Sequence, residues 1–406
     1  MLSLVNNILS SSAVLGFSST KSVLLDGTND FMTPGDFLDR GTNDFSVSMW
    51  FKEPSDASTS GATKYLFSKL EDSNNLIRLF LSSSNNKLFL DLIGGSTVVS
   101  NINGATAVDN IRDQWNHVLL SVDRDGDVNL YVNGSNSGHG TSGSAANSSQ
   151  TLNNTAPWRF GSRASGNDSL GGGVDEVAIY NAALSSDDAV KLYNSGKPTD
   201  LSLSASYDTD RTSNLEAWWR MGDGTNDNAS VIHDANNPGF DANLAEGDNS
   251  DFDTVGNWSG AGATVAGGYD SGDTDHSTTL RIQADGTTNS RAELAQSNLR
   301  TTTVANKVYL VTFDFKWINT TGITSDPFVT IGGTLKANID RTATGWTAYS
   351  AHFTAADNST AIRIYVQTGS SGHADNEILI DNFVIKPLKG FPGTLTNGPT
   401  IQTDAP

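Results

Sequence analysis

The acidic side chains of this sequence lack the spacing that glycoside hydrolysis requires. That reaction needs two carboxylates facing each other across a cleft, and no Glu-x-Asp-x-x-Glu motif is present to place them on one face of a strand. The nearest acidic neighbours inside a predicted strand are Asp175 and Glu176. Successive side chains of a strand point to opposite faces, so these two are not expected to act together. The sequence therefore predicts that the protein is not an enzyme.

Other routes to catalysis are also missing. There is no His-x-x-x-His pair, no Gly-x-Ser-x-Gly nucleophile elbow and no glycine-rich phosphate loop between a strand and a helix. The absence of cysteine excludes disulfides, zinc–thiolate sites and thiol nucleophiles. The six histidines are scattered along the chain at His117, His139, His233, His276, His352 and His373.

The charge balance argues against polyanionic partners. The 45 acidic and 25 basic residues give a formal net charge of −20, and the sequence shows no basic patch. Nucleic acid and anionic membrane surfaces would be repelled. No apolar run reaches the ~18 residues that span a membrane, so membrane insertion is not expected. An acidic surface does offer oxygen ligands to hard cations such as Ca²⁺.

Period-two alternation predicts an all-β protein. Apolar and polar residues alternate over residues 45–51, 128–132 and 309–317, as in strands with one buried face. Asp125-Gly126 between two apolar runs predicts a hairpin turn. One helix is expected, with Ser185 as N-cap and Gly196 near its end.

The chain is long enough for two modules of ordinary size. We expect two tandem antiparallel β-sandwiches with short arms at both ends, since polar Gly-, Asn- and Asp-rich stretches separate the strand-rich regions. The predicted segments are an N-terminal docking arm at 1–20, a first sandwich at 21–221, a linker at 222–250, a second sandwich at 251–388 and a C-terminal arm at 389–406.

Four phrases of the first half resemble the laminin-G-like, concanavalin A-like jelly-roll family. They are residues 22–31 (SVLLDGTNDF), 45–51 (FSVSMWF), 114–118 (QWNHV) and 173–185 (GVDEVAIYNAALS), in the family's order. The resemblance implies a two-sheet antiparallel sandwich and says little about the ligand. It also brings Asp30 and Asp175 into neighbouring phrases, which suggests a Ca²⁺ site there.

The second half resembles carbohydrate-binding modules of the family 4/9 type. The matching phrases are residues 251–258 (DFDTVGNW), 309–316 (YLVTFDFK), 345–350 (GWTAYS) and 380–385 (IDNFVI). In such modules an acidic residue of the first strand and the Asp of the closing strand often share a structural Ca²⁺, and Asp253 and Asp381 stand at those positions. Sugar binding is a further implication, although many jelly rolls of this type have lost it.

Exposed aromatic rings are the expected means of sugar binding, because the apolar face of a sugar stacks on them. Trp50, Trp115, Trp258 and Trp346 belong to framework phrases and are predicted to be core residues. The glycan-binding candidates are Trp317, Tyr365 and Tyr269. Trp218 and Trp219 are adjacent, so one ring is expected to be exposed or buried against a neighbour, and a partner subunit is one source of that cover.

The order of the two modules resembles virion-associated proteins of marine tailed phages. The leading hypothesis is a non-catalytic virion protein, either capsid decoration or a fibre or tail appendage, which assembles with other virion proteins and with itself and adsorbs to cell-surface polysaccharide. The N-terminal segment makes a poor signal peptide, which points the same way. The alternative is a secreted bacterial glycan-binding or adhesion protein, or an accessory module of a glycosidase. Virion surface and secretion are the corresponding locations.

Overall fold

The computed structural model divides the chain into two compact units. Unit 1 comprises Met1–Asn237 and Gly393–Pro406, and unit 2 comprises Pro238–Pro392. The structure describes residues 17–54, 63–82, 87–107, 112–138, 149–163, 168–305, 307–321, 323, 326–331, 334–367 and 374–406. Most of the predicted N-terminal arm, together with His139 and His373, lies outside the described residues.

Two antiparallel sheets form unit 1. The first, which we call the β3 sheet, contains in order β10 (Ser135–Gly138), β9 (Val128–Val132), β8 (Asn116–Val122), β3 (Phe45–Lys52), β12 (Gly171–Tyr180), β1 (Ser22–Asp26) and β26 (Thr400–Gln402), with β13 (Leu215–Trp219) also paired to β12. The second, the β5 sheet, contains β14 (Val231–Ile232), β25 (Gly393–Thr396), β2 (Phe31–Gly35), β11 (Trp158–Phe160), β4 (Lys64–Leu70), β5 (Asn75–Leu81), β6 (Lys87–Gly94) and β7 (Thr97–Ala107).

The β3 sheet is buried on both faces. In β3, Val47 and Met49 face the other sheet, as the alternation predicts, but the intervening Ser46 and Ser48 are also buried. Helix α1 (Ser186–Tyr193) and residues 201–218 cover this outer face and form an apolar cluster of their own with it. The expectation of a half-buried strand was therefore wrong for β3, because a short helix and the chain that follows it hide the polar positions.

The predicted helix is confirmed. Ser185 Oγ accepts the Asp188 N–H at 3.0 Å, and Asp188 Oδ2 accepts the Ser185 N–H at 3.0 Å, which is a capping box. The helix ends at Asn194, whose left-handed backbone (φ 42°) terminates it two residues before Gly196. Short 3₁₀ turns follow at Ser204–Ser206 and Thr212–Asn214. No helix among the described residues combines the length and apolar character needed to cross a membrane.

Unit 2 is a sandwich of two five-stranded antiparallel sheets. One sheet contains β15 (Trp258–Ala261), β18 (Arg291–Leu294), β23 (Ile362–Tyr365), β20 (Phe328–Ile331) and β21 (Thr334–Asn338). The other, the β24 sheet, contains β16 (Ala263–Tyr269), β17 (Thr279–Ala284), β24 (Glu377–Pro387), β19 (Val308–Asn319) and β22 (Thr347–Thr354). Short 3₁₀ turns lie at Gly247–Asn249 and Gln296–Asn298.

Strand β19 confirms the clearest prediction for the second half. Tyr309, Val311, Phe313, Phe315 and Trp317 are buried in the core of unit 2, while the residues between them are only partly buried. The predicted all-β architecture of two antiparallel sandwiches is likewise confirmed.

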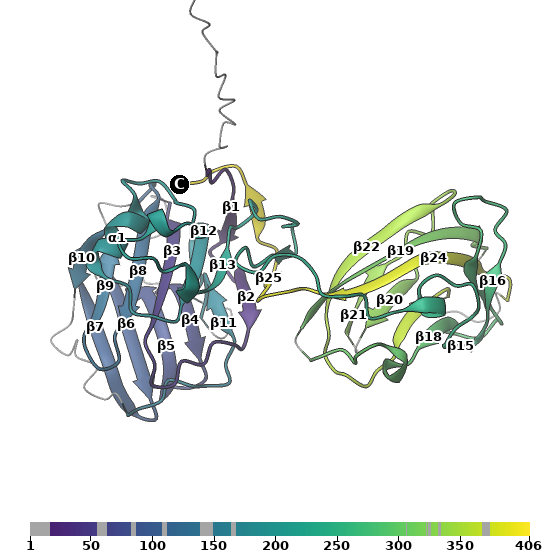
Figure 1. The fold of residues 1–406 in the computed structure, drawn as a ribbon, viewed down its shortest axis with the longest axis horizontal. Helices are drawn as coiled ribbons and strands as arrows, with labels where there is room; N and C mark the ends of the chain where they lie inside the picture. Colours follow the sequence, from purple (N-terminus) through teal and green to yellow (C-terminus); the bar gives the residue numbers. More distant parts are fainter. Residues whose placement is uncertain are drawn as a thin grey trace, which may run out of the picture. The chain divides into compact units, whose positions relative to one another are not determined.

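The C-terminal residues belong to unit 1 and do not form the arm that we expected at 389–406. Strand β25 pairs with β2 and β14 in one sheet, and β26 pairs with β1 in the other. Figure 1 shows these yellow strands beside the purple β1 and β2. Unit 2 is thus an insertion into the sequence of unit 1. Because β25 and β26 have only four and three residues among Gly, Pro and Thr, their sequence carries little strand signal.

The predicted linker at 222–250 is largely part of the two units. Asp227 fixes its first half, since its carboxylate accepts N–H groups of Gly222, Gly224 and His233 at 3.0, 3.0 and 2.6 Å. His233 and Asp234 are buried. Asp- and Gly-rich sequence therefore serves here as a hydrogen-bonded turn in place of a flexible connection.

Removal of residues 393–406 is expected to destabilise unit 1 by about 3 kcal/mol or more, because it deletes one strand from each sheet. Calorimetry of the truncated chain should show a lower transition temperature for unit 1. Isolated residues 238–392 should unfold at the same temperature as unit 2 does in the intact chain. An unchanged unit 1 transition would contradict this account.

Candidate functional site

Three aromatic rings lie side by side on the outer face of the β5 sheet, which is turned away from the β3 sheet. Tyr65, Phe80 and Phe89 occupy paired positions on β4, β5 and β6. The ring centroids of Tyr65 and Phe80 are 5.3 Å apart, and those of Phe80 and Phe89 are 5.6 Å apart, with interplanar angles of 26° and 14°. Phe80 and Phe89 are partly exposed, whereas Tyr65 is buried at one end of the row. We call this strip of apolar surface the aromatic strip.

A row of polar side chains runs beside the aromatic strip on the same face. Arg78 Nε donates to Asp91 Oδ2 at 2.7 Å, and Asn101 Nδ2 donates to Asp91 Oδ1 at 2.9 Å. Arg78 Nη1 also reaches the Tyr65 hydroxyl at 3.3 Å, and the guanidinium carbon lies 5.2 Å from the centroid of the Phe80 ring. These contacts hold Arg78, Asp91 and Asn101, which we call the polar row, in fixed positions beside the rings.

The strip and the row together suit a ligand that has both an apolar face and several hydroxyl groups. None of these residues was predicted as a site residue, because the sequence prediction considered only Trp and Tyr as platforms. The sequence signal that could have revealed these residues is the set of side chains that point outward from two neighbouring strands. Arg78 and Phe80 alternate in β5, and Phe89 and Asp91 alternate in β6.

The predicted glycan-binding residues Tyr269 and Tyr365 lie in different surroundings in unit 2. Tyr269 is 38% exposed, and the guanidinium carbon of Arg281 lies 5.2 Å from its ring centroid. Tyr365 is only 9% exposed, because its ring packs on Phe328 with a centroid distance of 4.3 Å. Tyr269 therefore keeps an accessible ring, whereas most of the Tyr365 ring is covered.

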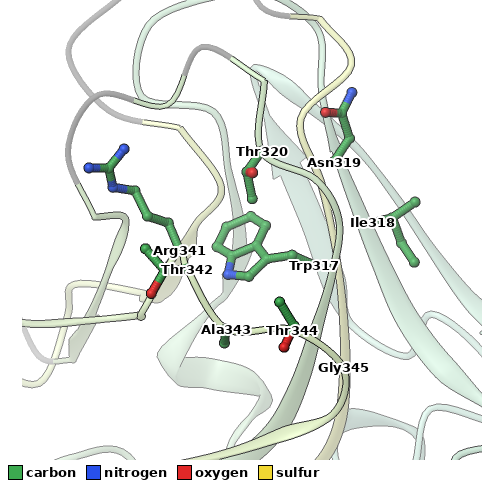
Figure 2. A pocket seen from close by; sticks show the side chains of 9 residues that line it. All are labelled: Trp317, Ile318, Asn319, Thr320, Arg341, Thr342, Ala343, Thr344 and Gly345. Atoms are coloured by element: carbon green, nitrogen blue, oxygen red, sulfur yellow. The ribbon is translucent and has the colours of Figure 1, made fainter.

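Trp317, the third predicted residue, lines a pocket of about 560 Å³. The pocket lies between the end of β19, at residues 317–320, and residues 341–345, which precede β22. Figure 2 shows the indole in the middle of the labelled side chains, with Arg341 and Thr342 on one side. The indole Nε1 donates to the Asp340 carbonyl at 3.0 Å, which fixes the orientation of the ring.

Two of the four framework tryptophans are core residues as predicted, and two are not. Trp50 and Trp258 are buried. Trp115 is partly exposed, and its Nε1 donates to Asp404 Oδ1 at 3.2 Å. Trp346 is partly exposed too, and it stacks on His276 with ring centroids 3.8 Å apart. Both of these rings lie in loops just before a strand, so the hydrophobic pattern of a strand does not apply to them.

Trp218 and Trp219 are both buried, which agrees with the second of the two expected outcomes, burial against a neighbour. The chain itself covers Trp218. Phe17 stacks on it with a centroid distance of 5.9 Å, and the Arg220 guanidinium carbon lies 4.4 Å from the Phe17 centroid. We call residues 17–21 the N-terminal strap.

Asp175 and Glu176 contribute to one buried cluster and do not point to opposite faces as expected. A bulge in β12 sets Glu176 and Val177 opposite the single residue Met49, and Glu176 has a left-handed backbone (φ 46°). Asp175 Oδ1 accepts the Glu176 N–H at 2.7 Å, and its Oδ2 accepts the hydroxyl of Ser19 at 2.5 Å.

The same cluster anchors the N-terminal strap. Glu176 accepts the indole N–H of Trp218 at 2.5 Å and lies 3.3 Å from Arg220 Nε. Asp223 accepts N–H groups of Thr20 and Lys21 at 2.6 and 2.9 Å. Burial raises the pKa of Glu176 to about 7, and burial together with the neighbouring Glu176 raises the pKa of Asp175 well above its usual range.

The predicted pairing of Asp30 with Asp175 does not occur. Asp175 stands next to Val174, which pairs with Val23 near the start of β1. Asp30 accepts the N–H of Asp26 at 3.1 Å, at the other end of β1. The length of a strand therefore separates the two carboxylates, and they do not form a common Ca²⁺ site.

The structure gives Asp253 and Asp381 separate partners. Asp381 Oδ2 lies 2.9 Å from His276 Nδ1, and its Oδ1 accepts the Asn382 N–H at 2.7 Å. Asp253 lies in an exposed acidic group with Asp248 and Asp251. The group formed by Asp44, Asp123 and Asp125 in unit 1 is the second place among the described residues where three carboxylates come close enough to hold a metal ion. The Ca²⁺ hypothesis therefore stays a prediction, and these two groups are the residues that fit it.

A comparison with protein-family models finds a match, which lies within unit 1. A family model described as the concanavalin A-like lectin/glucanases superfamily matches residues 26–189. No curated protein matches the chain. Strands β4, β5 and β6, which carry the aromatic strip, lie within the matched residues.

Several solved structures are similar to parts of the chain. A heptameric SAP-like pentraxin from Limulus polyphemus has 16% identity, with 44% of this chain and 84% of that chain covered and a TM-score of 0.34. Domain 4 of the extracellular arabinanase AbnA from Geobacillus stearothermophilus has 25% identity, with coverages of 42% and 76% and a TM-score of 0.33. The sialidase module CBM40 from Ruminococcus gnavus has 13% identity, with coverages of 44% and 100% and a TM-score of 0.31.

Glu176→Gln is expected to change how the stability of unit 1 depends on pH. The carboxyl has a pKa of about 7 when folded, against an ordinary value of 4.5, so the folded state holds the proton more tightly than the unfolded chain does. Its contribution to the free energy of unfolding should therefore fall between pH 4.5 and 7, by up to about 3 kcal/mol. Denaturant unfolding should show that the free energy of unfolding of the native protein, minus that of the variant, falls as the pH rises from 4.5 to 7. Parallel curves for the two proteins would contradict the assignment.

Proposed function

We propose that the protein is a non-catalytic carbohydrate-binding protein whose main glycan site is the outer face of the β5 sheet. One observation carries the proposal: the aromatic strip lies directly beside a polar row whose members already hold one another in place. The proposed ligand is an oligosaccharide segment that lies across β4, β5 and β6.

The chemistry of the two rows matches the two sides of a sugar ring. The C–H groups of a sugar pack on apolar rings, and its hydroxyl groups bond to carboxylate, guanidinium and amide groups. Arg78 and Asp91 are already ordered by their mutual contacts. Binding therefore costs little additional side-chain entropy.

The polar row supports binding and not cleavage. Its one carboxylate, Asp91, is bound to Arg78 and Asn101, and glycoside hydrolysis needs a pair of carboxylates on either side of the scissile bond. The family match over residues 26–189 supports a carbohydrate ligand, because that family is described by its lectins and glucanases.

The place of action stays a prediction from the sequence. We propose the surface of a tailed-phage particle, with assembly into the particle and self-association, and secretion is the alternative. Mass spectrometry of purified particles of the phage that encodes the protein separates the virion hypothesis from secretion. Stoichiometric detection supports the virion hypothesis, and complete absence from particles overturns it.

Phe89→Ala is expected to weaken oligosaccharide binding about tenfold, or ~1.4 kcal/mol, through the loss of an apolar ring face. A glycan array identifies the best oligosaccharide, and isothermal titration calorimetry then compares its dissociation constants. Leu203→Ala is the matched control, because it removes another exposed apolar side chain, 54% accessible, from unit 1. Equal affinities for the native protein and Phe89→Ala would refute the proposed site.

Asp91→Asn keeps the shape of the polar row but removes the charge that orients Arg78. We expect a similar loss of affinity together with a lower melting temperature, because Asp91 is buried and its charge pairs with Arg78, whose side chain is 25% exposed. Incubation of the native protein with the bound oligosaccharide should release no new reducing ends. Release that depends on Asp91 would show that the surface is catalytic.

A further inference from the structure

The pocket at the end of β19 differs from the outer face of the β5 sheet in shape and position. It lies in unit 2, between two loop segments, and has a volume of about 560 Å³. This volume falls within the usual range for small-ligand sites. Figure 2 shows Thr320, Thr342 and Thr344 near the Trp317 indole, whereas the Ile318 and Asn319 side chains point away from it.

The apolar part of the pocket is rigid. The Trp317 ring belongs to the core of unit 2, and its N–H is bound to the Asp340 carbonyl. The ring is therefore held in one orientation at the pocket wall. The neighbouring Ile318 side chain is 50% exposed. A ligand with an apolar face could pack here without any rearrangement of the ring.

The polar part of the pocket carries no uncompensated charge among its lining residues. Arg341 Nε lies 3.1 Å from Asp326 Oδ1, and Arg341 Nη1 donates to the Ile323 carbonyl at 2.5 Å. The other polar lining residues are neutral: Asn319, Thr320, Thr342 and Thr344. Neutral hydroxyl and amide groups beside a guanidinium whose charge Asp326 compensates favour a neutral hydroxylated ligand over a carboxylate or a phosphate.

Two of these polar groups are also fixed in position. The backbone N–H and the hydroxyl of Thr342 donate to Asp340 Oδ1 at 2.8 and 2.7 Å. Asn319 Oδ1 accepts the N–H and hydroxyl of Thr321 at 2.9 and 2.6 Å, which leaves the Asn319 amide nitrogen to act as a donor. The hydroxyl oxygen of Thr342 keeps lone pairs for accepting hydrogen bonds.

We propose that this pocket is a second carbohydrate site, which takes the terminal residue of a neutral glycan. A pocket between two loops admits the end of a chain, whereas an open sheet face admits an internal segment. The inference shares its class of ligand with the proposed function but rests on different residues. The protein would then have two sites for one polysaccharide, which raises its apparent affinity for a multivalent surface.

A panel of methyl glycosides of neutral hexoses tests the pocket in the full-length protein by saturation-transfer NMR. At least one glycoside should bind the native protein, and Thr344→Trp should weaken it at least fivefold by filling the pocket from an exposed position. Thr264→Trp is the matched control, because it makes the same change at an exposed threonine of unit 2 outside the pocket. Trp317→Phe, which keeps a ring in the core but removes the indole, should also weaken binding.

Phe89→Ala separates this inference from the proposed function. It should leave binding of the methyl glycoside unchanged while it weakens the oligosaccharide at the β5 sheet. The pocket assignment is overturned if no glycoside of the panel binds, or if binding persists unchanged in Thr344→Trp and Trp317→Phe. In both cases oligosaccharide binding that depends on Phe89 would still stand.

Discussion

Each unit contains a β-bulge in which an aspartate carboxylate accepts the N–H of the next residue. Within each unit, the packing of another segment against the sheet depends on this bulge. In β12, Asp175 accepts the N–H of the left-handed Glu176, and in β24, Asp381 accepts the N–H of the left-handed Asn382, both at 2.7 Å. In each strand two residues then face one residue of the neighbouring strand. The bulge redirects the side chains that follow and leaves the second carboxylate oxygen available for another segment.

That second oxygen holds a segment against the sheet in both units. Asp175 binds Ser19 of the N-terminal strap, and Asp381 binds His276, which stacks on Trp346. In unit 1 the strap, α1 and residues 201–218 therefore cover the outer face of the β3 sheet. The outer face of the β5 sheet keeps partly exposed rings, so the ligand site is proposed there.

Period-two patterning predicted the strands and the all-β class correctly, because alternation is a local property of the chain. Ser185 was likewise predicted correctly as the N-cap of α1. The assignment of residues 393–406 failed because β25 and β26 are short and gain their stability from β1 and β2, which lie more than 350 positions earlier in the sequence. The site residues Phe80, Phe89 and Asp91 were missed because a cross-strand row exists only once the register is known.

Hydroxyl-radical footprinting with the array-selected oligosaccharide tests the central claim, the glycan site on the β5 sheet, most directly. The phenyl rings of Phe80 and Phe89 are partly exposed and reactive, so bound ligand should lower their oxidation. Oxidation of Leu203, which is also exposed, should not change. Saturating binding that leaves both rings as reactive as in the free protein would contradict the account.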